Sequence, residues 1–178
     1  MSRFIQFAVF LLTFAIVIAS VLLSNMDAVG GDGAVLAADN PLYTPSESSL
    51  SAVLDADSFD APVYVLSDGL ISYRVGTSGG SPVGAVFVLS VTGWNPGLIY
   101  LVGVDSSGAI SGVEIIQQSE TPDFWEIVAD ARFYRGLVGN TAGAAVDTVS
   151  GATRTSYAIF RGADTAADYF VRNVLPTW

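Results

Sequence analysis

The sequence predicts an α+β fold: a single N-terminal transmembrane helix, followed by an antiparallel sheet with helices packed on one face. Three observations support this prediction. An apolar run opens the chain, segments rich in Val, Ile and Tyr fill its middle, and two amphipathic helical segments follow them. We therefore divide the 178 residues into a transmembrane anchor (1–24), a flexible tether (25–61) and one extracytoplasmic domain (62–178).

The apolar run from Phe4 to Leu23 is long enough to cross a membrane. As a helix, 20 residues span about 30 Å, the thickness of a bilayer's hydrocarbon core. Arg3 precedes the run and acidic residues follow it, which predicts a cytoplasmic N-terminus and a domain outside the cell membrane. A cleaved signal peptide, with a small-residue site at 35–37, is the alternative. We favour the retained anchor because the apolar core of a signal peptide is normally shorter.

The tether is rich in Gly, Ser, Asp and Pro, and a short helix at Ser48–Ala56 is the one element that we expect in it. β-rich segments follow, bounded by Gly or Pro, and Asp105–Gly108 is a turn that joins the last two as an antiparallel hairpin. The expected strands are Val63–Leu66, Leu70–Val75, Val83–Thr92, Leu98–Val104 and Ala109–Gln117.

Two helices are expected after the strands. Thr121 and Pro122 are typical of a helix start, and a helix over Asp123–Tyr134 has acidic residues early and basic residues late, as the helix dipole favours. A second helix runs from Thr155 to about Val174. Apolar residues recur along it at spacings of three or four and predict its buried face: Ile159, Ala163, Ala166, Phe170 and Val174.

The composition excludes several kinds of chemistry. The chain has no cysteine and no histidine, which removes disulfides, iron–sulfur clusters, thiol catalysis, Ser-His-Asp triads and His/Cys zinc sites. All seven basic residues are arginine, so a P-loop, which requires lysine, is also absent. A net charge of −10 argues against nucleic acid as a partner. We predict no metal site and no catalytic residue.

The segment Asp147–Ser156 is the candidate functional site. Its sequence, DTVSGATRTS, places small residues and hydroxyls directly before a helix. The free N–H groups and partial positive charge of a helix N-terminus favour an anion such as phosphate. The alternative is a helix capped by Ser or Thr after a tight turn, with no ligand.

The string Asp147-x-x-Ser-Gly-Ala-Thr153 resembles the flavinylation motif D-x-x-(S/T)-G-A-T of the FMN-binding domain family, which includes the RnfG and NqrC subunits of respiratory membrane complexes. Two weaker stretches match in the same order. Glu120-Thr121-Pro122 resembles the start of the family's E-T-P-G-L-G segment, and the GWNPGLI sequence from Gly93 resembles its G-Y-x-G-x-I strand entry. The resemblance covers about residues 62–174.

The resemblance implies that FMN is attached to Thr153 through a phosphoester bond, made from FAD by a separate Mg-dependent flavin transferase. Asp147 would be recognised by that transferase or help to bind Mg²⁺ during transfer, unless it is an ordinary turn residue. The remaining cofactor-binding residues implied by the resemblance are Ser150, Gly151, Ala152, Thr155 and Ser156 for the phosphate and ribityl chain, and Glu120, Thr121 and Trp94 along the ring or its tail.

The sequence departs from the family after Pro122. Asp123, Phe124 and Trp125 replace the family's Gly-Leu-Gly, so we expect a different environment for the flavin ring. Phe124 or Trp125 could stack on the ring, or both could be apolar residues that face the sheet.

The resemblance implies an electron carrier rather than an enzyme with its own substrate. The leading hypothesis is the FMN subunit of an Rnf-type complex in the cell membrane, which passes electrons from ferredoxin to NAD or a membrane acceptor and moves ions. Its partners would be the other membrane subunits of that complex and, during maturation, the transferase. The alternatives are a stand-alone exported flavin carrier or redox sensor, and a structural accessory module without a cofactor.

Overall fold

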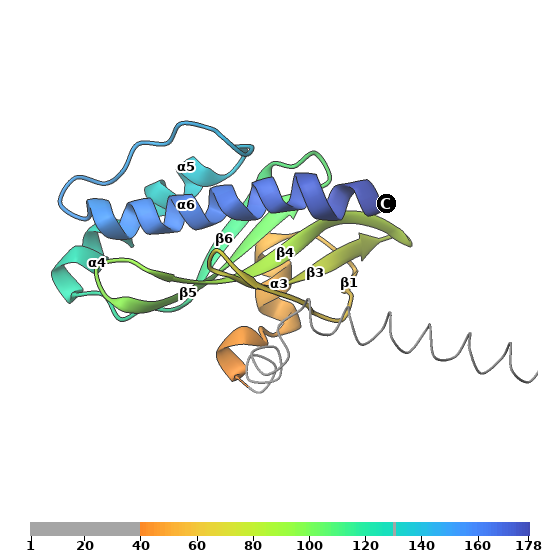
Figure 1. Cartoon of the computed structure of the whole chain (residues 1–178), viewed down its shortest axis with the longest axis horizontal. Coiled ribbons are helices and arrows are strands. Elements are labelled where there is room, and N and C mark those ends of the chain that lie inside the picture. Colours follow the sequence, from red (N-terminus) through yellow and green to blue (C-terminus); the bar gives the residue numbers. More distant parts are fainter. Residues whose placement is uncertain (1–39, 130) are drawn as a thin grey trace, which may run out of the picture.

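The computed structural model describes residues 40–129 and 131–178 (Figure 1). The predicted anchor and residues 25–39 of the predicted tether lie outside the described residues. Within the described part of the chain, no helix is long and apolar enough to cross a membrane.

An antiparallel sheet forms the centre of the fold, as the sequence predicts. It has six strands in the order β1-β3-β4-β5-β6, and β2 pairs with β3 beside β1. Each expected strand is present, and Asp105 accepts hydrogen bonds from the backbone of Ser107 and Ala109 in the turn of the β5–β6 hairpin. The strands are β1 (Ser58–Phe59), β2 (Val63–Ser67), β3 (Leu70–Ser78), β4 (Ser81–Thr92), β5 (Pro96–Asp105) and β6 (Ile110–Gln117).

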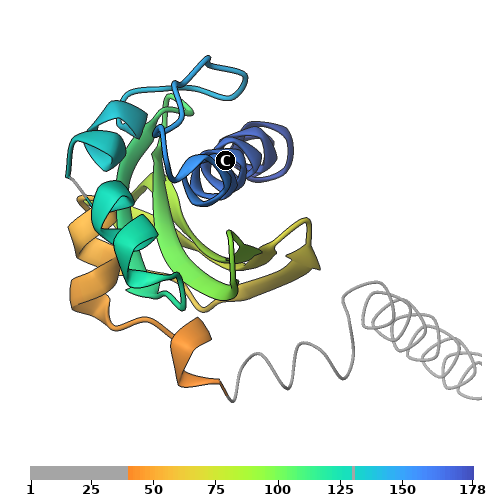
Figure 2. The same ribbon diagram turned by 90° about the vertical axis from the view of Figure 1, so that its left-hand side faces the viewer.

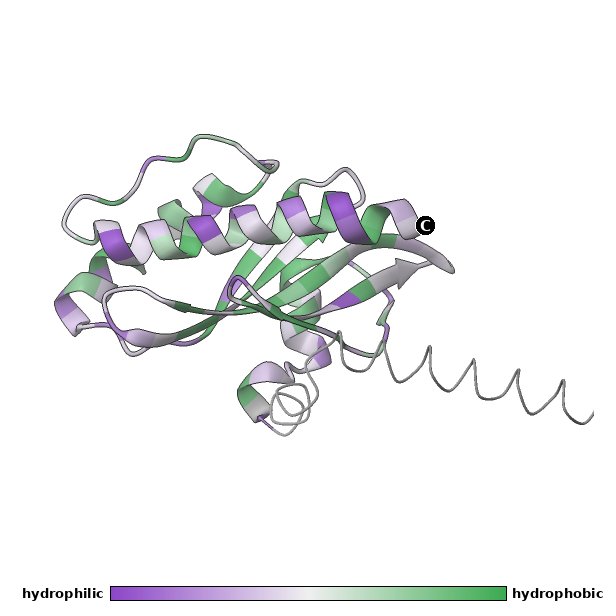
Figure 3. Ribbon diagram, viewed as in Figure 1, coloured by the Kyte–Doolittle hydropathy of each residue, from purple (hydrophilic) through white to green (hydrophobic). Residues whose placement is uncertain are grey.

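The long C-terminal helix α6 (Thr153–Tyr169) packs on one face of this sheet. A π-helical turn (Phe170–Val174) and a 3₁₀ turn (Leu175–Thr177) continue it to the C-terminus. The apolar stripe predicted for this helix is buried in one cluster with alternate residues of β4 and β5, such as Phe87 and Tyr100. Figure 3 shows hydrophilic and hydrophobic residues alternating along α6, as expected for a helix with one buried side.

Helix α3 (Glu47–Val53) covers the opposite face of the sheet, so the expectation that helices pack on one face only is wrong (Figure 2). Leu50, Val53 and Leu54 are buried there against the other set of alternate residues of β4 and β5. The segment 47–59, which the sequence analysis assigned to the tether, therefore packs into the folded domain. Burial of these three apolar side chains stabilises the segment on the sheet.

A row of glycines on the sheet lets α3 approach closely. A Cβ on Gly112 would lie 2.7 Å from the Val53 Cα, and one on Gly76 or Gly84 would lie within 2.9 Å of the Leu54 side chain. At Gly103 a Cβ would overlap the Val53 carbonyl oxygen. The end of α3 thus rests directly on the sheet backbone.

The helix expected over Asp123–Tyr134 is instead two short helices, α4 (Pro122–Val128) and α5 (Ala131–Leu137). Val128, Phe133 and Leu137 are all buried in the cluster beneath α6. In one continuous helix, positions five residues apart lie about 140° apart around the axis, so Val128 and Phe133 would not face the same core. The break between α4 and α5 allows both to be buried.

Candidate functional site

The N-terminus of α6 lies in the segment that the sequence singles out. Thr153 is the first residue of the helix and is exposed. Ala152 precedes it with φ −130° and ψ 35°, and in the part of the chain that the structure describes no side chain caps this helix. Gly151 has φ +87°, a conformation that favours glycine, and it brings the backbone into the turn before the helix. The first N–H groups of α6 are therefore available to a ligand.

Ser156 holds the turn that precedes α6. Its buried hydroxyl accepts a hydrogen bond from the Val149 N–H at 3.0 Å and donates to the Ala152 carbonyl oxygen at 3.0 Å. The Thr153 hydroxyl is within 3.4 Å of the Val149 carbonyl oxygen. Ser156 therefore shapes the backbone around Thr153 from inside, and its side chain does not face the solvent.

Glu120 joins three segments of the site. The residue is 6% exposed, and its carboxylate accepts hydrogen bonds from the backbone N–H groups of Trp94 (3.0 Å) and Asn95 (3.2 Å). It also accepts a 2.5 Å hydrogen bond from the buried Thr155 hydroxyl on α6. One buried carboxylate thus fixes the β4–β5 turn and the start of α6 relative to the segment that leads into α4.

Aromatic and cationic side chains stand beside Thr153. The rings of Trp94 and Phe124 contact each other, with centroids 5.6 Å apart, and the Arg154 guanidinium carbon lies 5.2 Å from the centre of the Trp94 ring. Trp94 is 52% exposed. These three side chains line a hollow of about 200 Å³ together with Gly151, Ala152, Thr153 and Thr155.

The structure brings together five of the predicted cofactor-binding residues: Trp94, Gly151, Ala152, Thr153 and Thr155 all line this hollow. Glu120 does not line it but supports two of its walls, and Thr121 is exposed at the start of α4. Ser150 is exposed and Ser156 is buried, and neither lines the hollow. Asp147 lies in a separate hollow of about 290 Å³, which Phe133 and Asn140 also line.

Phe124 and Trp125 take different positions. Phe124 lines the hollow at Thr153 and also contacts the core, whereas Trp125 packs against the core cluster beneath α6. Stacking on a ligand in the hollow is therefore open to Phe124. The sequence did not predict that Glu120 supports the turn at Trp94 and Asn95. The carboxylate lies 25 positions from Asn95 in the sequence, and no spacing pattern indicates that the two are in contact.

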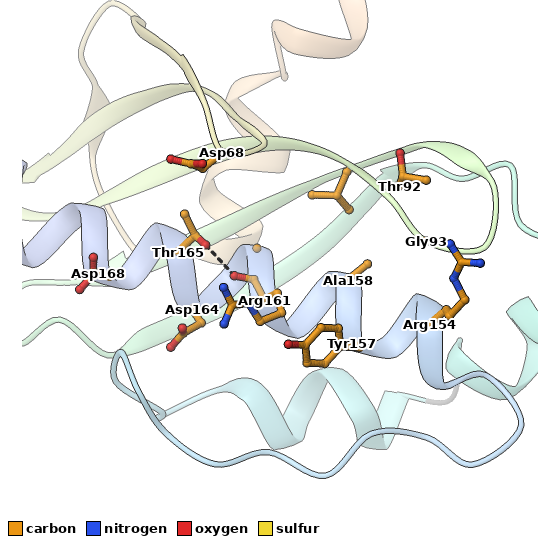
Figure 4. A pocket seen from close by; sticks show the side chains of 12 residues that line it. Asp68, Thr92, Gly93, Arg154, Tyr157, Ala158, Arg161, Asp164, Thr165 and Asp168 are labelled. Carbon is orange, nitrogen blue, oxygen red and sulfur yellow. Dashed lines mark hydrogen bonds between the residues drawn. The ribbon is translucent and has the colours of Figure 1, made fainter.

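A larger cleft of about 650 Å³ adjoins the hollow, and Arg154 borders both (Figure 4). One side of the cleft is the outer face of α6, with Tyr157 and Arg161. The other side is the end of β4 and the β2–β3 turn, with Thr92 and Asp68.

Tyr100 connects α6, which forms one side of this cleft, to the sheet. Its buried hydroxyl donates to the carbonyl oxygens of Ala158 (3.3 Å) and Ile159 (3.0 Å) on α6, and burial raises the pKa of Tyr100.

Among the described residues, no group of three acidic side chains converges as a metal site would require.

A comparison with protein families agrees with the sequence motif. The family model described as FMN-binding domain matches residues 93–168, which span the Trp94 turn, Glu120 and the start of α6. The crystal structure of NqrC from Shewanella oneidensis is similar, with 18% identity and a TM-score of 0.44, over 68% of this chain and 67% of that one. No curated protein matches the chain significantly. Residues 93–168 thus match the FMN-binding domain family that the Asp147–Thr153 string indicates.

Proposed function

We propose that the protein is a membrane-anchored flavoprotein subunit that carries FMN covalently, through a phosphoester at Thr153, and relays electrons. The observation that carries this proposal is the position of the Thr153 hydroxyl. It is exposed at the uncapped start of a 17-residue helix, in a hollow walled by Trp94 and Phe124. The match to the FMN-binding domain supports FMN as the ligand.

The residues around Thr153 fit a phosphoester of FMN. The free N–H groups and positive end of α6 would stabilise the remaining phosphate charge, and Arg154 is placed to add to it. Gly151 and Ala152 leave space for the phosphate beside the backbone. Trp94 and Phe124 offer apolar surfaces for a flat ring, and the adjoining cleft gives further space. FMN, when bound, supplies reversible electron transfer.

The chain cannot activate the Thr153 hydroxyl by itself. No histidine, lysine or cysteine exists in the sequence to act as a base, and the hydroxyl lies near a carbonyl oxygen rather than a carboxylate. We therefore assign the base to a separate flavin transferase. The Thr153 oxygen would form a bond to the FMN phosphorus of FAD, AMP would leave, and the hydroxyl proton would pass to the transferase. Asp147 would be part of the surface that this transferase recognises.

The proposed partners are the other membrane subunits of an Rnf-type complex, which passes electrons between ferredoxin and NAD or a membrane acceptor. An anchor at residues 1–24 would place the domain on the extracytoplasmic side of the cell membrane. Confining the domain to a thin layer above the bilayer would raise its effective concentration near those subunits.

The test is the intact mass of the full chain, produced together with a flavin transferase. We expect one FMN per chain in the parent protein and none in Thr153→Ala. Thr141→Ala is the matched control, because Thr141 is an exposed threonine in the same loop, and it should keep the flavin. An unmodified parent mass, while the same transferase modifies another acceptor, would exclude covalent FMN. Purification from native membranes without any multi-spanning subunit would exclude the Rnf-type assignment and leave a stand-alone carrier.

A further inference from the structure

The outer face of α6 presents a row of exposed side chains next to Thr153. Arg154, Tyr157 and Arg161 are all exposed, and their spacing of three and four residues places them along one side of the helix. We call these three residues the arginine row. They line the 650 Å³ cleft, and Figure 4 shows them in order along the helix.

The arginine row is unusual because of its charge. The chain has a net charge of −10 and only seven arginines. Arg74 and Arg172 are neutralised by Glu47 (3.3 Å) and Asp168 (2.8 Å), whereas Arg154 and Arg161 form no ion pair with any carboxylate that the structure describes. The positive end of the α6 dipole lies beside Arg154, where the phosphate of the proposed flavin would offset part of the charge. Arg154 and Arg161 thus give this side of α6 positive charge without an ion-pair partner among the described residues, on an acidic protein.

Three acidic residues also line the cleft. Asp164 lies beside Arg161, Asp68 lies on the facing turn, and Asp168 lies farther along α6 (Figure 4). Asp168 pairs with Arg172, and Asp164 accepts a hydrogen bond from the Gly143 N–H at 2.6 Å. Asp68, on the facing turn, accepts one from the Ser67 hydroxyl at 3.0 Å. Asp164 and Asp68 keep their negative charge, but both lie beyond Tyr157, so Arg154 is the charged lining residue nearest Thr153.

We propose that the arginine row is the docking surface for the acidic face of a redox partner protein. This inference rests on the proposed function, because docking there would bring the partner next to a flavin on Thr153. Arg, Tyr and Trp are the residues enriched at protein interfaces, and exposed Trp94 borders the row through its contact with Arg154. The rest of the protein surface is acidic, so it repels an acidic partner and steers that partner to the arginine row. A basic partner would have no preference for the arginine row.

The first experiment measures binding of a fluorescent hexaglutamate peptide to the full chain by anisotropy. We expect Arg161→Glu to weaken binding by about tenfold. Arg172→Glu is the matched control with the same change in net charge. It lies 11 residues further along, about 16 Å on a helix, beyond the screening length of about 10 Å in 0.1 M salt, and should change binding by less than about twofold. Equal losses in both variants, or no binding to the parent chain, would overturn the proposal.

The same titration with Thr153→Ala separates this inference from the proposed function. If the chain carries no flavin, hexaglutamate binding can still be measured and still tests the arginine row. Equal affinity with and without the flavin supports a docking surface that stays open. Binding to Thr153→Ala alone would show that the flavin covers the row and would overturn the proposal.

The second experiment identifies the occupant. A photo-reactive benzoylphenylalanine replaces Tyr157 in the full chain in native membranes, and the cross-linked peptide is sequenced. A cross-link to a segment rich in Asp and Glu of another redox protein supports the proposal. A cross-link to a second copy of this chain, or to a segment without acidic residues, contradicts it.

Discussion

The two faces of the sheet are packed in different ways. On the α3 face, glycines of β3 to β6 carry no side chain, and the end of α3 rests on the sheet backbone. On the α6 face, large side chains such as Phe87 and Tyr100 separate the helix from the strands. The α3 face is closely packed over the glycines, whereas the α6 face has the hollow at Thr153 and the cleft beside it.

The two faces of the sheet therefore have different roles: packing against α3 stabilises the fold, and the α6 face carries the candidate site. Close packing over the glycines holds the end of α3 directly on the sheet backbone. The α6 face is held by a few specific contacts, such as Tyr100 to the helix and Glu120 to Thr155, and these contacts position the start of α6 while the space around it stays open. Changes on the α3 face should therefore affect folding alone, and changes at the start of α6 should affect the site.

The largest effect should come from Gly103→Ala on the α3 face. The added methyl group would overlap the Val53 carbonyl oxygen, which belongs to the backbone and cannot rotate away. We expect a loss of about 3 kcal/mol in the free energy of unfolding, measured by urea denaturation. Below the transition, flavin attachment at Thr153 should be unchanged.

Gly136→Ala is the matched control for this change. Gly136 lies in α5, and a Cβ there would meet nothing within 4 Å. Alanine is the better helix former, so this variant should be neutral or more stable by up to about 1 kcal/mol. Equal losses in the two variants would mean that the close approach of α3 is not what makes Gly103 necessary.

Glu120→Gln should have the next largest effect, and it should act on the α6 face. The carboxylate accepts bonds from three donors, and the amide nitrogen of glutamine would face at least one of them. We expect a loss of about 2 kcal/mol in the free energy of unfolding, because a buried donor is left without an acceptor. Flavin incorporation per folded chain should also fall, since the Trp94 turn and the start of α6 lose their common support.

Thr155→Ser tests the same support more gently. Serine keeps the hydroxyl that donates to Glu120, so both stability and flavin incorporation should stay near the parent values. If Glu120→Gln lowered stability but left flavin incorporation intact, the two walls of the hollow would be positioned independently of this carboxylate.

The sheet and α6 could be predicted from the sequence because their signals are local. The Val- and Ile-rich strands and the stripe from Ile159 to Val174 follow from side-chain periodicity alone, and both are confirmed. Helix α3 was predicted as a short helix, but its place on the sheet was not. Its docking depends on glycines far away in the sequence, and a missing side chain gives no pattern that indicates a partner.

The candidate site could likewise be predicted from the sequence only in part. The position of Thr153 at the start of α6 follows from the small residues and hydroxyls that precede the helix. The roles of Glu120, Thr155 and Ser156 depend on which hydroxyls turn inward, and the sequence does not specify this. The row from Arg154 to Arg161 was also missed, because the sequence alone does not show which arginines have carboxylate partners.

The smallest effect concerns two tyrosines of the α6 face, the buried Tyr100 and the half-buried Tyr134. Tyr100 donates to the backbone of α6, whereas the Tyr134 hydroxyl is buried without a hydrogen-bond partner in the part of the chain that the structure describes. Burial raises the pKa of Tyr134 from 10 to about 12, so the folded state favours the neutral phenol. This contribution to stability is complete below pH 10 and is lost as the pH rises toward 12.

Tyr134→Phe removes that contribution. At pH 7 the free energy of unfolding should change by less than about 0.5 kcal/mol, because the hydroxyl has no partner to lose. Above pH 10 the variant should retain more of its stability than the parent, and urea denaturation at pH 7 and pH 11 measures the difference. Because the chain has no lysine, side chains other than tyrosine contribute little titration in this range. Parallel losses in parent and variant would show that Tyr134 ionises as freely as an exposed tyrosine and that the α6 face is open there too.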